Sequence, residues 1–392
     1  MHISEKQGIM LEVFLLCLML AGGGILSWNR GDADTDSQVR SIRQENTGAE
    51  SGDSGEPGKE PVQEKEKDYI KWVEFNVTSE AMKKAYQYDL DSYGKEPHLH
   101  WVDLLAILGA RYGGDFTRYQ EEDLADIAEK LLAGSQTVEE MTKDMEYYSY
   151  YREAYGAVLD GMVGEFQYVH PKKKVYGLKA YSPIAKEFPY SDYDDFGVSR
   201  SYGYKRNHLG HDMMGQVGTP VIAVESGYVS ALGWNQYGGW RIGISSFDGR
   251  RYYYYAHLRQ DRPYAEGLKE GAVVQAGDVI GYIGRTGYST EENTNNIDEY
   301  HLHFGLQLIF DESQREGNNE IWVSCYELTR FLSQNRSEVQ RDDETKEWTR
   351  VRQIKDPEAI HYRNRQRKIR DRAVTSIPET YFLRNCSFPP GF

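Results

Sequence analysis

The sequence predicts a multidomain chain: an N-terminal membrane segment, a small all-α domain, an antiparallel all-β domain that is β-sandwich-like, and a mixed C-terminal extension. Three observations predict this fold class. An apolar run lies near the N-terminus, apolar residues recur at helical spacing over positions 69–170, and short β-branched and aromatic runs separated by Gly, Asp and Asn cover positions 175–310. The length of 392 residues fits two folded units joined by linkers.

The first 28 residues predict a signal peptide or a signal anchor. The apolar run "VFLLCLMLAGGGILSW" is short for a spanning helix and long for the apolar region of a signal peptide. Both interpretations send the rest of the chain across a membrane, and we favour the uncleaved anchor. Residues 29–68 are rich in Asp, Glu, Gly and Ser, which predicts a disordered acidic linker that holds the folded part away from the membrane.

Residues 69–170 predict a helical domain of about four helices. In "HWVDLLAILGARYGG", the apolar residues Trp101, Leu104, Leu105 and Leu108 recur at i, i+3, i+4 and i+7, which places them on one helical face. Ser79 is the candidate N-terminal cap of the preceding helix. This domain shows no catalytic motif, so a spacing role or the docking of an envelope protein partner is the default expectation.

Residues 175–310 predict the β domain, because "PVIAVESGYVSALGW", "WRIGISSF", "RYYYYAHL", "DVIGYIG" and "HLHFGLQLI" read as short strands between turns. Residues 311–392 form the C-terminal extension, which is partly basic. Its stretch "RVRQIKDPEAIHYRNRQRKIRDR" predicts a helix, for which a solvated surface is the favoured interpretation over binding to a polyanionic wall.

Charge and cysteine content limit the function further. The formal net charge of -15 argues against nonspecific nucleic-acid binding and suits an extracytoplasmic protein. Cys325 and Cys386 could pair in an oxidising compartment, although their spacing alone cannot show that they reach bonding geometry.

The tripeptide His-Leu-His occurs twice, and its two contexts differ. His98 and His100 lie at a predicted helix start, where residues two apart point about 200° apart, and no carboxylate or cysteine follows at a ligand-like spacing. We therefore expect exposed polar histidines there. His301 and His303 lie in a predicted strand, where residues i and i+2 share one face and can point at one site.

Five residues of the β region form the candidate site: His208, Asp212, His257, His301 and His303. A catalytic zinc ion needs three nitrogen or oxygen ligands and one open position for water, which two histidines and one aspartate supply. Two histidines remain for acid–base chemistry. The zincin motif HExxH is absent, so histidine is the candidate general base at neutral pH. His211 would point away from Asp212 on a strand and is left as a supporting or exposed group.

The motifs "HLGHD", "YAHL" and "HLHF", in this order, resemble those of the lysostaphin/LytM-type zinc endopeptidases, which cut peptidoglycan peptides. The glycine-rich run "GLKEGAVVQAGDVIGYIGRTGYST" between the last two motifs also resembles that family, and the resemblance covers residues 196–310. It implies the duplicated-hybrid-motif fold and a metallopeptidase domain. It further implies that His208, Asp212 and His303 hold zinc, that His301 is the general base, and that His257 orients the water or stabilises the oxyanion.

Two departures from the family pattern concern specificity rather than ligands. The segment "EENTNNIDE", residues 291–299, is inserted before the second His-Leu-His and predicts a longer acidic loop beside the cleft. Gly305 stands where the family often has Glu, and no catalytic role follows from that position.

Three functions remain open at this point. The first is a membrane-anchored or secreted endopeptidase that faces the cell wall and hydrolyses the cross-links or stem peptides of peptidoglycan. The second is a catalytically silent envelope scaffold or activator of other wall hydrolases, which the intact ligand set disfavours. The third is a secreted protease with a protein substrate, because specificity resides in loops.

Overall fold

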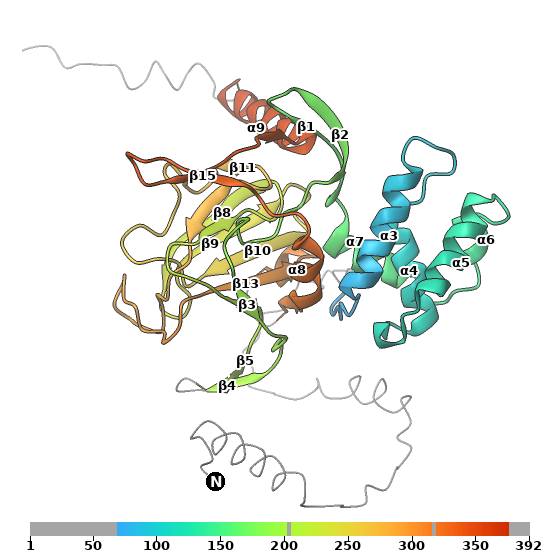
Figure 1. The fold of residues 1–392 in the computed structure, drawn as a ribbon, viewed down its shortest axis with the longest axis horizontal. Coiled ribbons are helices and arrows are strands. Elements are labelled where there is room, and N and C mark those ends of the chain that lie inside the picture. Colours follow the sequence, from blue (N-terminus) through green and yellow to red (C-terminus); the bar gives the residue numbers. More distant parts are fainter. Residues whose placement is uncertain (1–68, 202–204, 316–318, 376–392) are drawn as a thin grey trace, which may run out of the picture. The chain divides into compact units, whose positions relative to one another are not determined.

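The structure, a computed structural model, describes residues 69–201, 205–315 and 319–375 (Figure 1). The predicted membrane segment 1–28, the predicted linker 29–68 and Cys386 lie outside the described residues. Within the described ranges, no helix combines the length and the apolar character needed to cross a membrane.

The N-terminal part of the described chain is helical, as predicted. Helix α4 buries Trp101, Leu104, Leu105 and Leu108 on its inner side and ends at Gly113, which adopts the left-handed φ of 63°. The helices here are α3 (Ser79–Ser92), α4 (Trp101–Tyr112), the 3-10 helix η1 (Phe116–Arg118), α5 (Glu121–Leu132), α6 (Val138–Thr142) and α7 (Tyr148–Leu159).

The prediction of Ser79 as a cap was wrong by one residue. Thr78 caps α3, because its hydroxyl oxygen accepts the amide hydrogen of Ala81 at 3.3 Å. Ser79 is the first helical residue, and its amide donates to Glu327 Oε2 at 2.6 Å. A distant carboxylate thus satisfies a second free amide of the helix start, which local sequence cannot reveal.

The predicted helical segment 69–170 also contains a strand. Residues Val163–Tyr168 form β1, which pairs antiparallel with β2 (Lys173–Leu178) and with β17 (Ile354–Lys355). Its main partner is β2, which follows after a short turn and pairs along the whole of β1, whereas β17 pairs with it at two residues.

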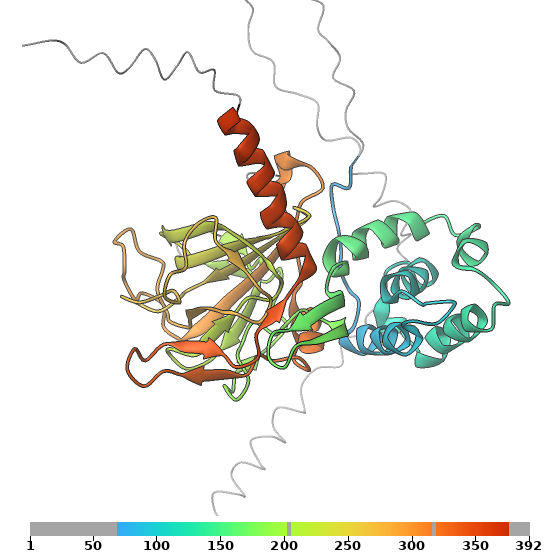
Figure 2. The same cartoon turned by 90° about the horizontal axis from the view of Figure 1, so that it is seen from above.

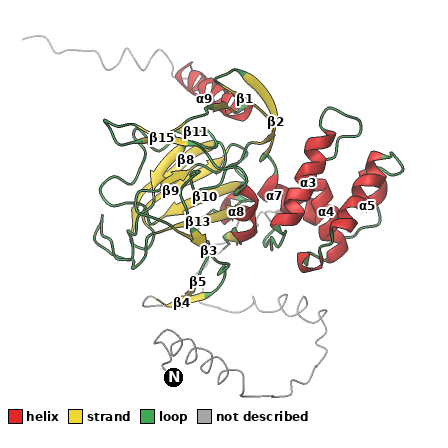
Figure 3. Ribbon diagram, in the orientation of Figure 1, coloured by secondary structure: helices red, strands yellow, loops and turns green. Residues whose placement is uncertain are grey.

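The β region is built on one eight-stranded antiparallel sheet with the order β11-β8-β9-β10-β13-β6-β3, and β14 pairs with β13 (Figures 1 and 3). Its strands are β3 (Ser191–Asp192), β6 (His211–Met214), β8 (Gly227–Asn235), β9 (Gly239–Ser246), β10 (Arg251–Ala256), β11 (Val273–Val274), β13 (His301–Leu308) and β14 (Ile321–Val323). Three two-stranded ribbons accompany it: β4 (Ser199–Ser201) with β5 (Lys205–Asn207), β7 (Pro220–Ile222) with β12 (Val279–Tyr282), and β15 (Val339–Arg341) with β16 (Trp348–Arg350).

Alternation along the central strands separates the core from the site. In β13, Leu302 and Phe304 are buried in the core, so His301 and His303 point to the opposite face of the sheet. In β10, Tyr253 and Tyr255 belong to the core, whereas Tyr252 and Tyr254 share a face with His303. The alternation of side chains that the sequence predicts therefore places both histidines on the face opposite the core.

The described residues all belong to one compact unit that begins at Lys67, and one hydrophobic core includes both helical and sheet residues. Tyr86 of α3 packs edge-on against Phe331 of α8 (Tyr326–Leu332) with ring centroids 6.1 Å apart. The buried Arg251 of β10 donates to the carbonyl oxygen of Ala157 in α7 at 2.9 Å. The helices and the sheet therefore stabilise each other.

The basic C-terminal stretch forms helix α9 (Pro357–Thr375), which Figure 2 shows from a second side. Its start is fixed by Lys179, whose ammonium group lies 3.0 Å from both Asp356 Oδ1 and Glu358 Oε1. Cys325 is buried with a free thiol, and burial raises the pKa of this thiol to about 12.

Candidate metal centre

Three side chains converge at one end of the central strands. Asp212 of β6 lies directly opposite His303 of β13, and His208 lies in the turn before β6. Asp212 Oδ1 is 2.8 Å from His303 Nδ1 and 3.0 Å from His208 Nε2. The two histidine nitrogens are 3.0 Å apart. These three atoms point at a common centre and offer the two nitrogens and one oxygen that zinc accepts.

A glycine makes this convergence possible. A Cβ atom at Gly210 would lie 2.5 Å from Cε1 and Nε2 of the His303 ring, so a larger residue would displace the ligand. The absence of a side chain at Gly210 therefore leaves room for the His303 ring.

Two further charged residues hold the ligands, and sequence reasoning missed both. Asp195 Oδ1 lies 3.0 Å from His208 Nδ1, which favours a proton on Nδ1 and leaves the Nε2 lone pair for a metal. Arg200 contacts Asp195 and also lies 2.8 Å from Asp212 Oδ2, so it orients the second oxygen of that ligand. The acidic run "SDYDDF" was the available signal, but nothing local tells which of its carboxylates turns inward.

The protonation states suit metal ligands. Burial by itself would raise the pKa of Asp212, but the neighbouring His208 and His303 hold it well below its usual range. Burial lowers the pKa of His303. The cluster therefore consists of a carboxylate beside neutral imidazole, which is the form that binds zinc.

His257 and His301 flank the three ligands with matching tautomers. His257 Nδ1 lies 2.9 Å from the carbonyl oxygen of Thr286, and His301 Nδ1 lies 3.0 Å from that of Glu299. Because a carbonyl only accepts, both Nδ1 atoms carry the proton and both Nε2 atoms keep a lone pair. The centroids of the His257 and His301 rings are 4.8 Å apart, and His301 Nε2 is 3.8 Å from Asp212 Oδ1.

The environment keeps His257 neutral. Burial, together with His301 and His303, holds the pKa of His257 well below its usual value. A neutral ring with a free Nε2 accepts a hydrogen bond, so this geometry favours the orientation of a water molecule over the donation of a hydrogen bond to an oxyanion.

His211 lies outside this cluster. It is buried, its Nε2 atom is 2.9 Å from Asp192 Oδ2, and its ring packs edge-on against Tyr326. As a neighbour of Asp212 on β6 it points to the other face, where it supports the packing of α8.

The first His-Leu-His has a partner that the sequence analysis did not foresee. Asp89 of α3, which precedes the histidines, lies 3.0 Å from His98 Nε2, and the His98 and His100 rings are 4.5 Å apart. These three residues could bring ligand atoms within 4.8 Å of one another. The expectation that this pair has no ligand-like neighbour was therefore wrong.

The oxygens of Asp89, however, already accept strong hydrogen bonds. Oδ1 accepts from the Tyr176 hydroxyl at 2.5 Å, and Oδ2 accepts from the Trp101 amide at the start of α4 at 2.9 Å. This network ties α3, α4 and β2 together. In contrast, Asp212 Oδ1 faces the histidine nitrogens, so the His208–Asp212–His303 cluster is the better candidate for a metal site.

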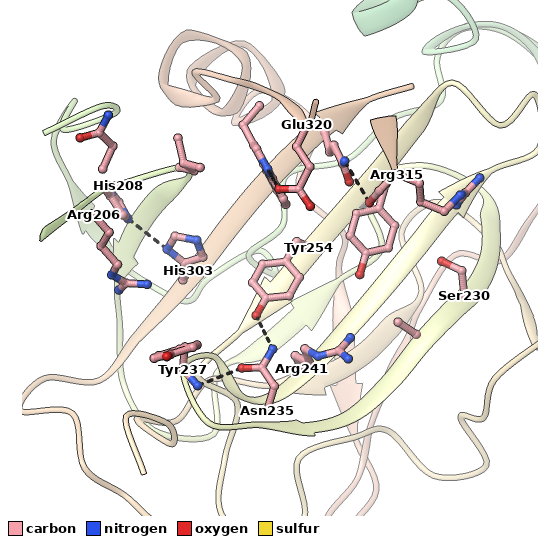
Figure 4. A pocket seen from close by; sticks show the side chains of 16 residues that line it. Arg206, His208, Ser230, Asn235, Tyr237, Arg241, Tyr254, His303, Arg315 and Glu320 are labelled. Atoms are coloured by element: carbon pink, nitrogen blue, oxygen red, sulfur yellow. Dashed lines mark hydrogen bonds between the residues drawn. The ribbon is translucent and has the colours of Figure 1, made fainter. Parts of the chain in front are cut away.

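A cleft of about 640 Å³ extends from His208 and His303 across the open face of the sheet (Figure 4). Its lining residues are Arg206, Asn207, His208, Leu209, Ser230, Ala231, Asn235, Tyr237, Arg241, Tyr252, Tyr254, His303, Gln307, Arg315, Glu320 and Trp322. Gly305 has a steric role here, because a Cβ atom at this position would lie 2.7 Å from the Trp322 ring.

The inserted segment 291–299 does not line this cleft. Asn293 Oδ1 accepts hydrogen bonds from Trp240 Nε1 at 2.8 Å and from the Asp261 amide at 2.9 Å, and Asn295 donates to Gln260 at 2.7 Å. The asparagines thus fasten the insertion to the loop after His257, and its last residue supplies the carbonyl that orients His301.

An antiparallel β domain with a buried His–Asp–His cluster at one end of a cleft has the donor atoms and the open site expected of a metallopeptidase domain. Residues 206–316 match peptidase family M23. The chain therefore carries an M23 peptidase domain, as the sequence motifs predicted.

Two curated relatives resemble this region. An L-Ala–D-Glu endopeptidase of Bacillus subtilis (strain 168) is 37% identical over 124 residues, which cover 32% of this chain and 36% of the relative. Lysostaphin of Staphylococcus simulans is 40% identical over 98 residues, which cover 25% of this chain and 17% of lysostaphin. The chain thus spans about a third or less of the length of these relatives.

Two solved structures are also similar. A lytM-type protein of Ruminococcus gnavus ATCC 29149 is 26% identical, covers 66% of this chain and 89% of its own, and gives a TM-score of 0.46. The catalytic domain of lysostaphin from Staphylococcus simulans is 33% identical, covers 33% of this chain and 84% of its own, and gives a TM-score of 0.26.

Proposed function

We propose that this protein is a zinc-dependent endopeptidase that hydrolyses peptide bonds of bacterial peptidoglycan. The observation that carries the proposal is the convergence of His208, Asp212 and His303 beside two histidines that present free Nε2 atoms. The M23 match and the relatives named as endopeptidases support it.

Zinc bound by His208, Asp212 and His303 would supply Lewis acidity and lower the pKa of water to about 7. His301 Nε2 accepts the proton of the attacking water and later donates it to the leaving amine. His257 Nε2 accepts a hydrogen bond from the same water and so fixes its direction of attack. Asp195 and Arg200 hold the ligands in place through His208 and Asp212.

The relatives suggest two candidate bonds. One relative is named for an L-Ala–D-Glu bond, and another for a glycyl-glycine bond. The same site residues can hydrolyse either bond, because the choice of peptide depends on the residues that line the cleft. We further propose that the protein acts outside the cytoplasm and faces the cell wall. Residues 1–28 would direct it there as a membrane anchor or a signal peptide.

Digestion of purified sacculi tests the proposal. We expect the zinc-loaded protein to hold one zinc ion per chain and to release new amino groups, with mass spectrometry of the fragments identifying the cut bond. His303→Ala should lose both zinc and activity, whereas His361→Ala, at an exposed position of α9, should keep both.

Other outcomes separate the competing functions. Intact sacculi and muropeptides in the presence of a zinc-loaded protein, beside an active reference endopeptidase, would contradict the proposal. Full rescue of a null strain by His301→Ala would favour an envelope scaffold. Cleavage of proteins but not of sacculi would favour a secreted protease.

A further inference from the structure

The cleft differs in charge from the rest of the chain. The whole sequence carries a formal net charge of -15, yet the cleft lining contains Arg206, Arg241 and Arg315 against a single glutamate, Glu320. An acidic protein that gathers arginines in the cleft beside its metal cluster indicates a ligand with negative charge.

Two of these arginines have no counter-charge. Within residues 69–201, 205–315 and 319–375, neither Arg206 nor Arg241 forms an ion pair, and the buried Nε atom of each lacks a hydrogen-bond partner. Arg315 differs, because its Nε atom lies 2.7 Å from Glu312 Oε1. With no carboxylate on either guanidinium, the positive charges of Arg206 and Arg241 are available to an anionic group in the cleft that both residues line.

Both arginines line the same cleft as Tyr254 and His303. Arg206 stacks over the Tyr288 ring at 4.8 Å and lies near His208, while Arg241 lies near Asn235 (Figure 4). The Tyr254 ring is 6.0 Å from the His303 ring, which places the charged region next to the metal cluster.

The floor of the cleft is aromatic. Tyr254 pairs with Gly243 of β9 and Gly305 of β13. The Tyr252 and Trp322 rings fill the space over these glycines, since a Cβ atom at Gly305 would lie 2.7 Å from the Trp322 ring. Tyr252, Tyr254 and Trp322 thus offer rings on which a peptide can pack.

We propose that Arg206 and Arg241 form a carboxylate-binding subsite that selects acidic peptides, with a free carboxyl group within a residue or two of the bond to be cut. This inference rests on the proposed function and narrows its substrate class. A planar guanidinium binds a carboxylate through two parallel hydrogen bonds, so amidation of that carboxyl removes both the charge and one acceptor.

Matched synthetic peptides test the subsite in the zinc-loaded full chain. The three probes are an L-Ala–D-Glu–L-Lys peptide with a free glutamate carboxyl, the same peptide with that carboxyl amidated, and pentaglycine, each with its C-terminal carboxyl blocked as an amide. We expect kcat/KM for the acidic peptide to exceed that for its amidated twin by about 10–100-fold, the range of one hydrogen-bonded charge. High salt should reduce this ratio.

Variants assign the preference to the arginines. Arg241→Met and Arg206→Met should each bring the acidic-to-amidated ratio towards one, and Arg241→Lys should give an intermediate ratio. Arg250→Met, at an exposed position outside the cleft lining, should retain the wild-type ratio. Equal cleavage of both peptides by the wild type, or an unchanged ratio in both arginine variants, would overturn the inference.

Binding separates this inference from the proposed function. In a His301→Ala chain, the fluorescence anisotropy of labelled acidic and amidated peptides measures affinity without turnover. If the wild type cuts neither sacculi nor any of the peptides, the proposed function fails, and the affinity ratio alone then decides whether the arginines select a carboxylate. Equal affinities for the two peptides would refute the subsite.

Discussion

The substitution Glu225→Gln should destabilise the protein through a buried ion pair far from the metal cluster. Arg251 has a side-chain exposure of 2% and Glu225 one of 6%. Glu225 Oε2 accepts from Arg251 Nε at 2.7 Å and from the Tyr253 hydroxyl at 2.7 Å, while Oε1 accepts from Arg251 Nη2 at 3.0 Å. Arg251 also reaches Ala157, so the pair connects helix α7 to the sheet.

Glutamine preserves the size of the side chain but cannot satisfy this geometry. If its carbonyl oxygen keeps the two bonds at the Oε2 position, its amide group faces Arg251 Nη2 donor to donor. Arg251 then lies buried without a nearby full counter-charge, apart from its 3.1 Å contact with the partly exposed Asp248. Removal of one partner from a buried pair costs about 3–5 kcal/mol, and we expect the lower half of this range because two bonds survive.

Urea denaturation, followed by circular dichroism at neutral pH, measures this loss. The control Glu312→Gln breaks an exposed pair with Arg315 and should cost about 0–1 kcal/mol. The double variant Glu225→Gln/Arg251→Met should recover part of the stability, because it removes the unpaired charge. A loss below about 1 kcal/mol in Glu225→Gln, or a double variant less stable than the single one, would refute the reasoning.

Three other substitutions test the ligand cluster and the attachment of α9. Gly210→Ala should weaken zinc affinity by at least about tenfold, measured by competition with a chelator, because the new Cβ atom would lie 2.5 Å from the His303 ring. Asp195→Asn should weaken zinc affinity by about 10–100-fold, since His208 loses the carboxylate 3.0 Å from its Nδ1. Burial alone would lower the pKa of Lys179, but Asp356 and Glu358 raise it above its usual value. The charged lysine therefore stabilises the fold at neutral pH. This stabilisation is lost as the pH rises through the pKa of Lys179 in the folded protein. The difference in unfolding free energy between wild type and Lys179→Met, measured by urea denaturation from pH 8 upward, should therefore shrink above about pH 10.4.

The two predictions on zinc affinity each have a matched control. Gly164→Ala places its Cβ atom at an ordinary contact distance of 3.7 Å from Lys179, so it should leave zinc affinity unchanged. Asp194→Asn changes an exposed neighbour of Asp195 and should also leave it unchanged. Unchanged zinc affinity in Gly210→Ala or Asp195→Asn would count against the geometry, as would a Lys179→Met difference that does not shrink at alkaline pH.

Local sequence patterns predicted those helices and strands whose buried face follows from the spacing of apolar residues along the chain. The spacing of Trp101, Leu104, Leu105 and Leu108 predicted the buried face of α4. The alternation in "HLHFGLQL" predicted a strand with both histidines on one face. Strand β1 was missed because it forms a hairpin with β2 across the predicted boundary between the helical and β domains. The Thr78 cap was missed because Thr78 and Ser79 are adjacent residues that can both cap a helix.

The two His-Leu-His tripeptides show where the sequence alone stops. It determined that His301 and His303 share a strand face and that the motif set belongs to the M23 family. Only the tertiary structure brought Asp89 to His98, and Asp195 and Arg200 to the ligand cluster. Those contacts join elements that are separated in the chain, and no local periodicity encodes which distant carboxylate fills a given space. The same physical reason applies to Arg206 and Arg241, which form no ion pair with any residue that the structure describes, because the position of counter-charges depends on the folded neighbourhood.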